Sequence, residues 1–185
     1  MDIYKILINE GSGCEKVSLV HYPAVEKDFL AFSKKGMEPR MNLSFSSDEE
    51  REVWGVAMLA DTPIYRRDGD YEYYIVFEKD AIKKMVLKYF KEKRIADVNL
   101  EHFSDVDGVT LIESVITSDR VALKGFEDVP EGSWVIGMKV ENDAVWESIK
   151  KGELRGFSIE GLFNFELVPT ELKDEETDFF ESLVD

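Results

Sequence analysis

The sequence holds two histidines, and one of them could act as a general base. His102 ends the run Asn99-Leu100-Glu101-His102, where a strand pattern gives way to a polar turn, whereas His21 ends a strand pattern near the N-terminus. Histidine is the side chain whose ordinary pKa lets it accept and return a proton near neutral pH. Its position makes His102 the candidate base and His21 the weaker one.

Ser158 is the candidate nucleophile. It lies within a strand pattern, with Gly156 two residues before it and Gly161 three residues after it. Glycines in a strand let a substrate backbone approach closely and leave backbone N–H groups accessible to an oxyanion. The pattern continues as a strand after Ser158, unlike the strand-to-helix Gly-x-Ser-x-Gly turn of α/β-hydrolases. A strand serine usually only faces solvent, so a catalytic role for Ser158 requires a base beside it.

A serine–histidine pair also needs a third group that orients the imidazole. If the strands predicted at 97–102 and 110–117 pair as a hairpin, His102 faces Leu111. Glu113 then shares that face one step along the strand, within diagonal reach of the ring. A shift of one residue in the register would remove this relation. On this assumption Glu113 is the predicted third member.

Glu160 is the alternative third member. It lies two residues after Ser158, and residues two apart point to the same face of a strand. Glu101 is less suitable, because it points to the face opposite His102. The residues alone leave the choice between Glu113 and Glu160 open.

No cofactor or metal is expected. The sequence lacks a Walker loop, a dinucleotide fingerprint and a His-Glu-x-x-His motif, and the Asp105–Asp107 turn lacks the spacing of an EF-hand. Cys14 is the only cysteine, so neither an intrachain disulfide nor a thiolate metal cluster can form. The lone cysteine also favours a reducing compartment.

Charge and hydropathy limit the partners. The formal net charge is -16, which repels nucleic acid and anionic membranes and fits a basic partner or none. No stretch approaches eighteen apolar residues, so no membrane span is expected, and the first nine residues do not resemble a secretory signal. Hydrophobic residues make up 44% of the chain, which is enough for a sizeable core. We therefore expect an intracellular, soluble domain.

The hydrophobic patterns predict an α+β domain that is mostly β. A helix is predicted at 81–93 from apolar residues at helical spacing, and a second, shorter helix runs from Asn142 or Asp143 to Lys151. We expect one domain over 1–168 with a mobile loop at 33–50, followed by an acidic tail at 169–185. The predicted strands lie at 3–9, 16–22, 52–60, 71–77, 97–102, 110–117, 133–140 and 155–165.

Several of these segments together resemble the XkdF-like phage serine proteases, a branch of the prohead protease group. The resemblance covers about residues 18–165, and its most specific part is 146–161, which includes Gly156-Phe157-Ser158-Ile159-Glu160-Gly161. The order and spacing of the segments carry it. The other segments that contribute to the resemblance are Ser18-Leu19-Val20 with Pro23-Ala24-Val25, 55–66 ending in Pro63-Ile64-Tyr65-Arg66, Ile75-Val76-Phe77, Asn99-Leu100-Glu101-His102, Glu113-Ser114 and 132–137.

The resemblance implies a fold similar to herpesvirus assemblin, a closed β-barrel with peripheral helices. It implies that the histidine precedes the serine, as His102 precedes Ser158. Assemblin uses a second histidine as the third member, but His21 lies upstream instead of after the serine, which favours an acid such as Glu113. An arginine near the serine would serve the oxyanion; Arg155 is the nearest, but strand parity points it away from Ser158.

The implied function is that of a serine endopeptidase that cleaves scaffold and major capsid proteins in the host cytoplasm, inside the assembling viral procapsid. Nucleic acid and membranes are not expected as partners, and a homo-oligomer is left open. The alternative is a non-catalytic scaffold or assembly protein derived from such a protease. The acidic surface and tail favour this alternative. The two differ in one respect: only the protease needs a reactive Ser158.

Overall fold

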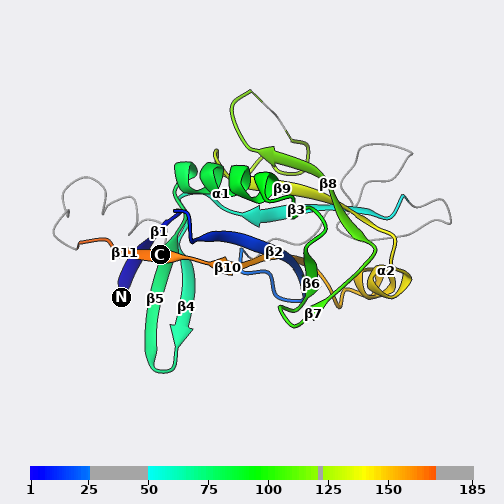
Figure 1. Cartoon of the computed structure of the whole chain (residues 1–185), viewed down its shortest axis with the longest axis horizontal. Coiled ribbons are helices and arrows are strands. Elements are labelled where there is room, and N and C mark those ends of the chain that lie inside the picture. The colour runs from blue at the N-terminus through cyan, green and yellow to red at the C-terminus, as the bar shows by residue number, and fades with distance from the viewer. Residues whose placement is uncertain (26–49, 121–122, 170–185) are drawn as a thin grey trace.

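The computed structural model of the chain describes residues 1–25, 50–120 and 123–169 (Figure 1). The loop predicted at 33–50 lies outside the described residues except for Glu50, and the tail predicted at 169–185 lies outside them except for Pro169. The division into one domain and a tail stays a prediction. In the described part, no helix is long and apolar enough to cross a membrane.

The described strands form three sheets. In the first, the strand order is β11 (Asn164–Leu167), β1 (Asp2–Leu7), β5 (Tyr71–Val76) and β4 (Ile64–Asp68). The second sheet has the order β10 (Gly156–Leu162), β2 (Gly13–Val20), β6 (Val98–Leu100) and β7 (Ser104–Asp105). The third has the order β3 (Glu52–Met58), β9 (Trp134–Val140) and β8 (Val109–Ile116).

The mostly-β content with two helices agrees with the sequence, but the closed barrel expected from the resemblance is wrong. A barrel needs an unbroken ring of paired strands. Among the described residues, the two edge strands of each sheet do not pair with each other. The chain instead passes from one sheet to another: β1 and β11 belong to the first sheet, whereas the adjoining β2 and β10 belong to the second. The described strands therefore form three open sheets and no closed ring.

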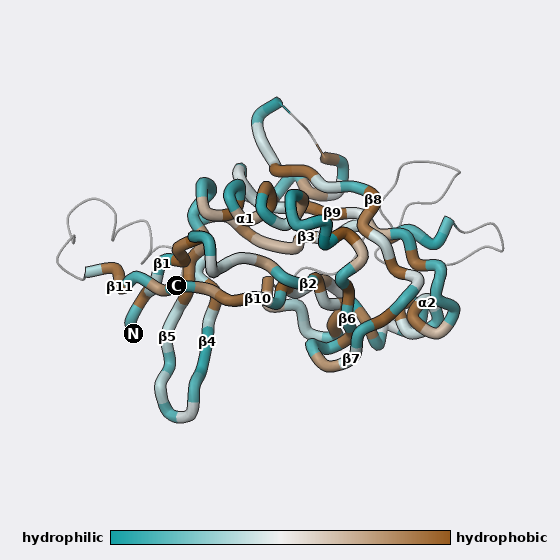
Figure 2. The backbone as a smooth tube through the Cα atoms, viewed as in Figure 1, coloured by the Kyte–Doolittle hydropathy of each residue, from teal (hydrophilic) through white to brown (hydrophobic). Residues whose placement is uncertain are grey.

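The two helices follow from their sequences. Helix α1 (Lys79–Lys91) buries Ala81, Ile82, Met85, Val86 and Tyr89 on one side, and Figure 2 shows hydrophobic and hydrophilic residues alternating along it. Its N-cap is Glu78, whose side chain makes no capping hydrogen bond. Helix α2 (Asp143–Lys150) begins at Asn142, whose side chain accepts hydrogen bonds from the N–H groups of Ala144 and Val145.

The predicted hairpin between 97–102 and 110–117 does not form. Strand β6 pairs with the two-residue strand β7, with Asn99 opposite Asp105, and β8 pairs with β9 in the third sheet. A strand of two residues leaves no periodic pattern in the sequence, so β7 could not be predicted. β4 and β11 were also missed as separate strands. β4 joins β5 through a turn at Gly69 and Asp70, and the two strands form a hairpin that projects from the body (Figure 1).

Candidate active site

Three neighbouring strands of the second sheet bring polar residues into one row. Ser158 on β10 lies opposite Ser18 on β2, and Ser18 lies opposite Asn99 on β6. Residues opposite one another in a sheet point to the same face. Ser18 and Asn99 are buried, with 0% and 2% of their surface exposed, and Ser158 is 8% exposed. The register therefore places these three polar residues side by side on one face of the sheet.

A tight turn after β6 places the imidazole over this row. Glu101 and His102 both adopt left-handed backbone conformations, with φ values of 52° and 62°. Residues other than glycine rarely take this conformation, and such strain tends to persist at functional sites. The turn is held by hydrogen bonds from the Glu101 N–H to the Leu19 carbonyl, at 3.1 Å, and from the Phe103 N–H to the Leu100 carbonyl, at 3.0 Å.

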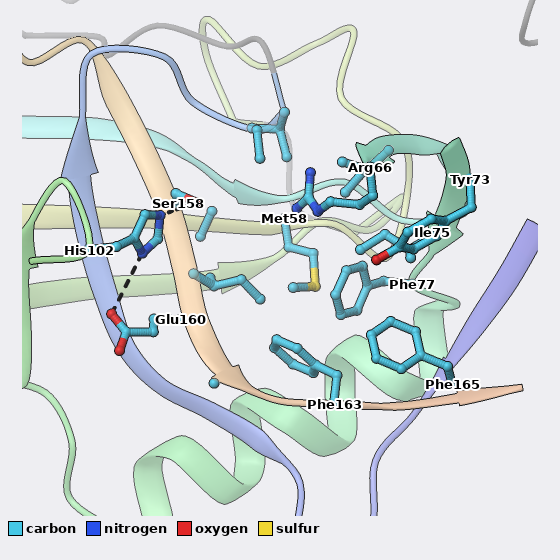
Figure 3. A pocket seen from close by; sticks show the side chains of 16 residues that line it. Met58, Arg66, Tyr73, Ile75, Phe77, His102, Ser158, Glu160, Phe163 and Phe165 are labelled. Carbon is cyan, nitrogen blue, oxygen red and sulfur yellow. Dashed lines mark hydrogen bonds and ion pairs between the residues drawn. The ribbon is translucent and has the colours of Figure 1, made fainter. Parts of the chain in front are cut away.

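His102 contacts a hydroxyl through each of its ring nitrogens. Its Nε2 lies 3.1 Å from the Oγ of Ser158, and its Nδ1 lies 2.8 Å from the Oγ of Ser18. Both distances are in hydrogen-bonding range. The structure thus brings together Ser158 and His102, the two residues that the sequence singled out as nucleophile and base (Figure 3).

Glu160 is the carboxylate beside His102. Its Oε2 lies 3.6 Å from the Nδ1 of His102 and accepts a hydrogen bond of 2.6 Å from the Nδ2 of Asn99. Figure 3 shows this carboxylate directed at the imidazole from the same strand as Ser158. At 3.6 Å the carboxylate can stabilise a positive charge on the ring, although the separation is too long for a strong hydrogen bond.

A bulge in β10 follows Glu160. The register with β2 shifts between Glu160 and Gly161, and a Cβ at position 161 would lie 2.0 Å from the carbonyl oxygen of Gly13. Only glycine permits this close approach of the two backbones. The glycine that marked the Ser158 strand in the sequence is therefore required by strand packing next to the site.

Glu113, the predicted third member, is not brought to His102. It lies on β8 in the third sheet, where its Oε2 accepts a hydrogen bond of 2.8 Å from the Nε1 of Trp54. The cause is the hairpin that does not form, since the prediction depended on that pairing. Glu160, the alternative, occupies the position next to the ring.

The remaining predicted candidates have other contacts. The Nδ1 of His21 lies 2.9 Å from the Glu153 carbonyl oxygen, and its backbone N–H donates to Glu101 at 2.6 Å, so it supports the turn that carries His102. The backbone N–H of Arg155 donates to the Val20 carbonyl at 2.8 Å, and Arg155 does not line the pocket described below. Ser18 and Asn99 were not predicted as site residues, because only the pairing of distant strands reveals them.

A pocket opens beside these residues, and we call it the His102 pocket. Its volume is about 300 Å3, and Ser158, His102 and Glu160 line it together with Arg66 and Tyr73. Most of the remaining wall is apolar and includes Met58, Ile75, Phe77, Phe163 and Phe165 (Figure 3). Among the described residues, no group of three or more histidine, cysteine, aspartate or glutamate side chains could hold a metal ion. The arrangement suits nucleophilic attack by a serine on a group bound in the pocket.

Two curated proteins resemble the chain over most of its length. The chain is 29% identical to the "Phage-like element PBSX protein XkdF" of Bacillus subtilis over 154 residues, which are 79% of this chain and 52% of that protein. It is also 29% identical to the "Uncharacterized protein YqbD" of the same organism over 150 residues, 78% of this chain and 43% of that protein. The chain thus spans about half the length of the curated relatives it matches. No solved structure gives a significant match.

A family model described as "Putative phage serine protease XkdF" matches residues 41–166. This match includes His102, Ser158 and Glu160 and covers more than half of the chain. The chain therefore belongs to the XkdF family of phage serine proteases.

Proposed function

We propose that the chain is a serine endopeptidase in which Ser158 is the nucleophile and His102 the base. The observation that supports this most directly is the 3.1 Å contact between the Nε2 of His102 and the Oγ of Ser158 at the edge of a pocket. The family description, which names a serine protease, points the same way.

The reaction would follow the usual course of acyl transfer. With its proton on Nδ1, His102 accepts the Ser158 hydroxyl proton on Nε2 while the Oγ attacks the peptide carbonyl. The imidazolium then donates this proton to the leaving amine, which leaves an acyl-enzyme ester on Ser158. Water, deprotonated by the same nitrogen, hydrolyses the ester and restores the serine.

Two groups would assist the imidazole. With the proton on Nδ1, Ser18 would accept it across 2.8 Å, and the nearby Glu160 carboxylate, which can only accept, favours this tautomer, in which Nε2 is free to act as a base. Glu160, held by Asn99, faces the ring at 3.6 Å and would stabilise the imidazolium that forms during the reaction. We propose Glu160 in the place of Glu113 as the acidic member.

We further propose that the substrates are scaffold and capsid proteins, cleaved inside the assembling procapsid in the host cytoplasm. The descriptions of the family and of the Bacillus relative, both of which refer to phage, support this setting. A protease enclosed with its substrates is also a physical means of confining hydrolysis to particle assembly.

The test is co-expression of the chain with candidate phage scaffold and capsid proteins. Ser158→Ala should abolish their processing and also labelling by a fluorophosphonate, a probe that reacts with activated serines. Ser104→Ala, at an exposed serine on β7, is the matched control and should leave both unchanged. Unaltered processing by Ser158→Ala would refute the protease, and normal assembly with an unlabelled Ser158 would identify the non-catalytic assembly protein.

A further inference from the structure

Arg66 brings a positive charge into the His102 pocket. Its side chain is half-buried and extends from β4 toward Met58, with His102 and Ser158 across the pocket (Figure 3). Its NH1 donates to the carbonyl of the adjoining Tyr65 at 3.0 Å. Among the residues that the structure describes, no carboxylate lies within ion-pair distance of this guanidinium.

This arrangement is unfavourable in the empty protein. Burial disfavours the charged form and lowers the pKa of Arg66, although a guanidinium remains protonated in proteins. A partly desolvated cation without a counter-ion costs free energy that an anionic ligand can recover. The position therefore favours a bound group with a negative charge.

The other charged groups of the pocket do not offer an equal site for a basic ligand. Glu160 is the carboxylate that lines the pocket, and it is already engaged by Asn99 and by His102. Apolar side chains such as Phe77 and Phe163, which contact each other edge-to-face at 5.4 Å, form the wall between. A substrate side chain with an apolar stem and a terminal carboxylate fits this pocket, because the stem can contact the apolar wall while the carboxylate reaches Arg66.

We propose that the His102 pocket binds a carboxylate of the peptide substrate, and that Arg66 selects it. The carboxylate belongs either to an aspartate or glutamate side chain next to the cleaved bond or to the C-terminus of the substrate. The net charge of -16 disfavours the approach of acidic polypeptides to the chain as a whole, and the half-buried Arg66 supplies a local attraction. As a specificity for cleavage, the inference rests on the proposed function.

Binding measured without catalysis tests the pocket on its own. The full chain carrying Ser158→Ala is titrated with fluorescent octapeptide mixtures that are acetylated and amidated and hold glutamate, glutamine or lysine at one fixed position. A second pair of mixtures lacks acidic side chains and ends in either a free carboxylate or an amide. Preference within the first set identifies a side chain as the source, and preference within the second pair identifies the C-terminus.

We expect the carboxylate-bearing mixture to bind about tenfold more tightly than its neutral counterpart, as a charge-assisted arginine contact would give. Adding Arg66→Gln should abolish this preference, and Arg66→Lys should retain part of it, because lysine keeps the charge but loses the bidentate geometry. Arg67→Gln is the matched control: it removes the same charge from the next residue on β4, where Arg67 is exposed and contacts Gly69 and Asp70.

Equal binding of charged and neutral mixtures, or a preference that survives Arg66→Gln, would overturn the proposal. Failure of the protease itself has a different signature, because the unsubstituted serine would then remain unlabelled by fluorophosphonate while the binding preference persists. Conversely, labelling without a carboxylate preference would keep the protease and remove only the role of Arg66. Thermal unfolding of each variant verifies that the chain is folded during the titration.

Discussion

Ser18 and Ser158 face each other across β2 and β10, and the imidazole of His102 contacts both hydroxyls, at 2.8 Å and 3.1 Å. One histidine is thus fixed through both of its ring nitrogens by two paired strands. Because the ring is already held in place, little of its rotational freedom remains to be lost when the transition state forms. The first three predictions below test parts of this arrangement, and two more concern the buried thiol of Cys14.

Ser18→Ala should lower kcat/KM about tenfold while Ser158 remains reactive, because the ring loses the acceptor that holds its Nδ1–H. The measurement is the rate of fluorophosphonate labelling together with peptide hydrolysis. Ser114→Ala is the control, since it removes a comparable hydrogen bond, of 2.8 Å from Trp134, on the third sheet. An equal loss of activity per folded molecule in both variants would mean that Ser18 has only a structural role.

Glu160→Gln should reduce kcat/KM by about ten- to a hundredfold, because the amide keeps the shape but cannot stabilise an imidazolium at 3.6 Å. Glu113→Gln serves as the paired variant, since its carboxylate contacts Trp54 in another sheet. It should leave kcat/KM within about twofold of the parent chain. If Glu113→Gln had the larger effect, the acidic member would have been wrongly assigned.

Gly161→Ala should destabilise the fold by about 3 kcal/mol, since its Cβ would lie 2.0 Å from the carbonyl oxygen of Gly13. Separation of β2 and β10 at the bulge should also misplace Glu160 relative to His102. Denaturant unfolding and labelling of Ser158 measure the two effects. Gly11→Ala, with an atom no closer than 3.9 Å to its new Cβ, should leave the unfolding midpoint nearly unchanged.

Cys14 should resist thiol reagents in the folded protein. It is 3% exposed, and burial raises the pKa of its thiol from 9.0 to about 12. At pH 8 the native chain should therefore react slowly with a disulfide reagent and rapidly, with one thiol per chain, after unfolding. Reaction at the same rate in both states would show that β2 opens readily opposite Gly161, its partner in β10.

The same thiol makes stability depend on pH. An unfolded thiol begins to ionise near pH 9, whereas the folded one stays protonated to about pH 12. The stabilising contribution is complete below pH 9 and is lost as the pH rises from about 9 to about 12. Cys14→Ala should therefore flatten the fall in unfolding free energy over this interval, as measured by denaturant titration. An unchanged slope in the variant would assign the alkaline loss to other groups, such as Tyr89, whose pKa burial also raises.

The sequence by itself determined the local features of this protein. The apolar spacing that predicted helix 81–93 depends on contacts three and four residues apart, and α1 occupies Lys79–Lys91. Most strand positions were likewise predicted from local patterns, mainly the alternation of apolar and polar residues. Because the chain has only two histidines, the choice of His102 required little more than its place at the end of a strand.

Only the tertiary structure decided which residues accompany His102 and Ser158. Local alternation named Glu160 only as an alternative on the Ser158 strand. Ser18 reaches the ring, and Asn99 reaches Glu160, through pairings between strands that are distant in the chain, and no local periodicity encodes such a register. The hairpin that would have placed Glu113 beside His102 does not form, because β6 pairs with the short strand β7. The closed barrel that the resemblance implied is wrong because no sheet of the described residues closes on itself. The packing of the whole core determines which strands pair, and the strand pairing in turn determines the geometry of the site.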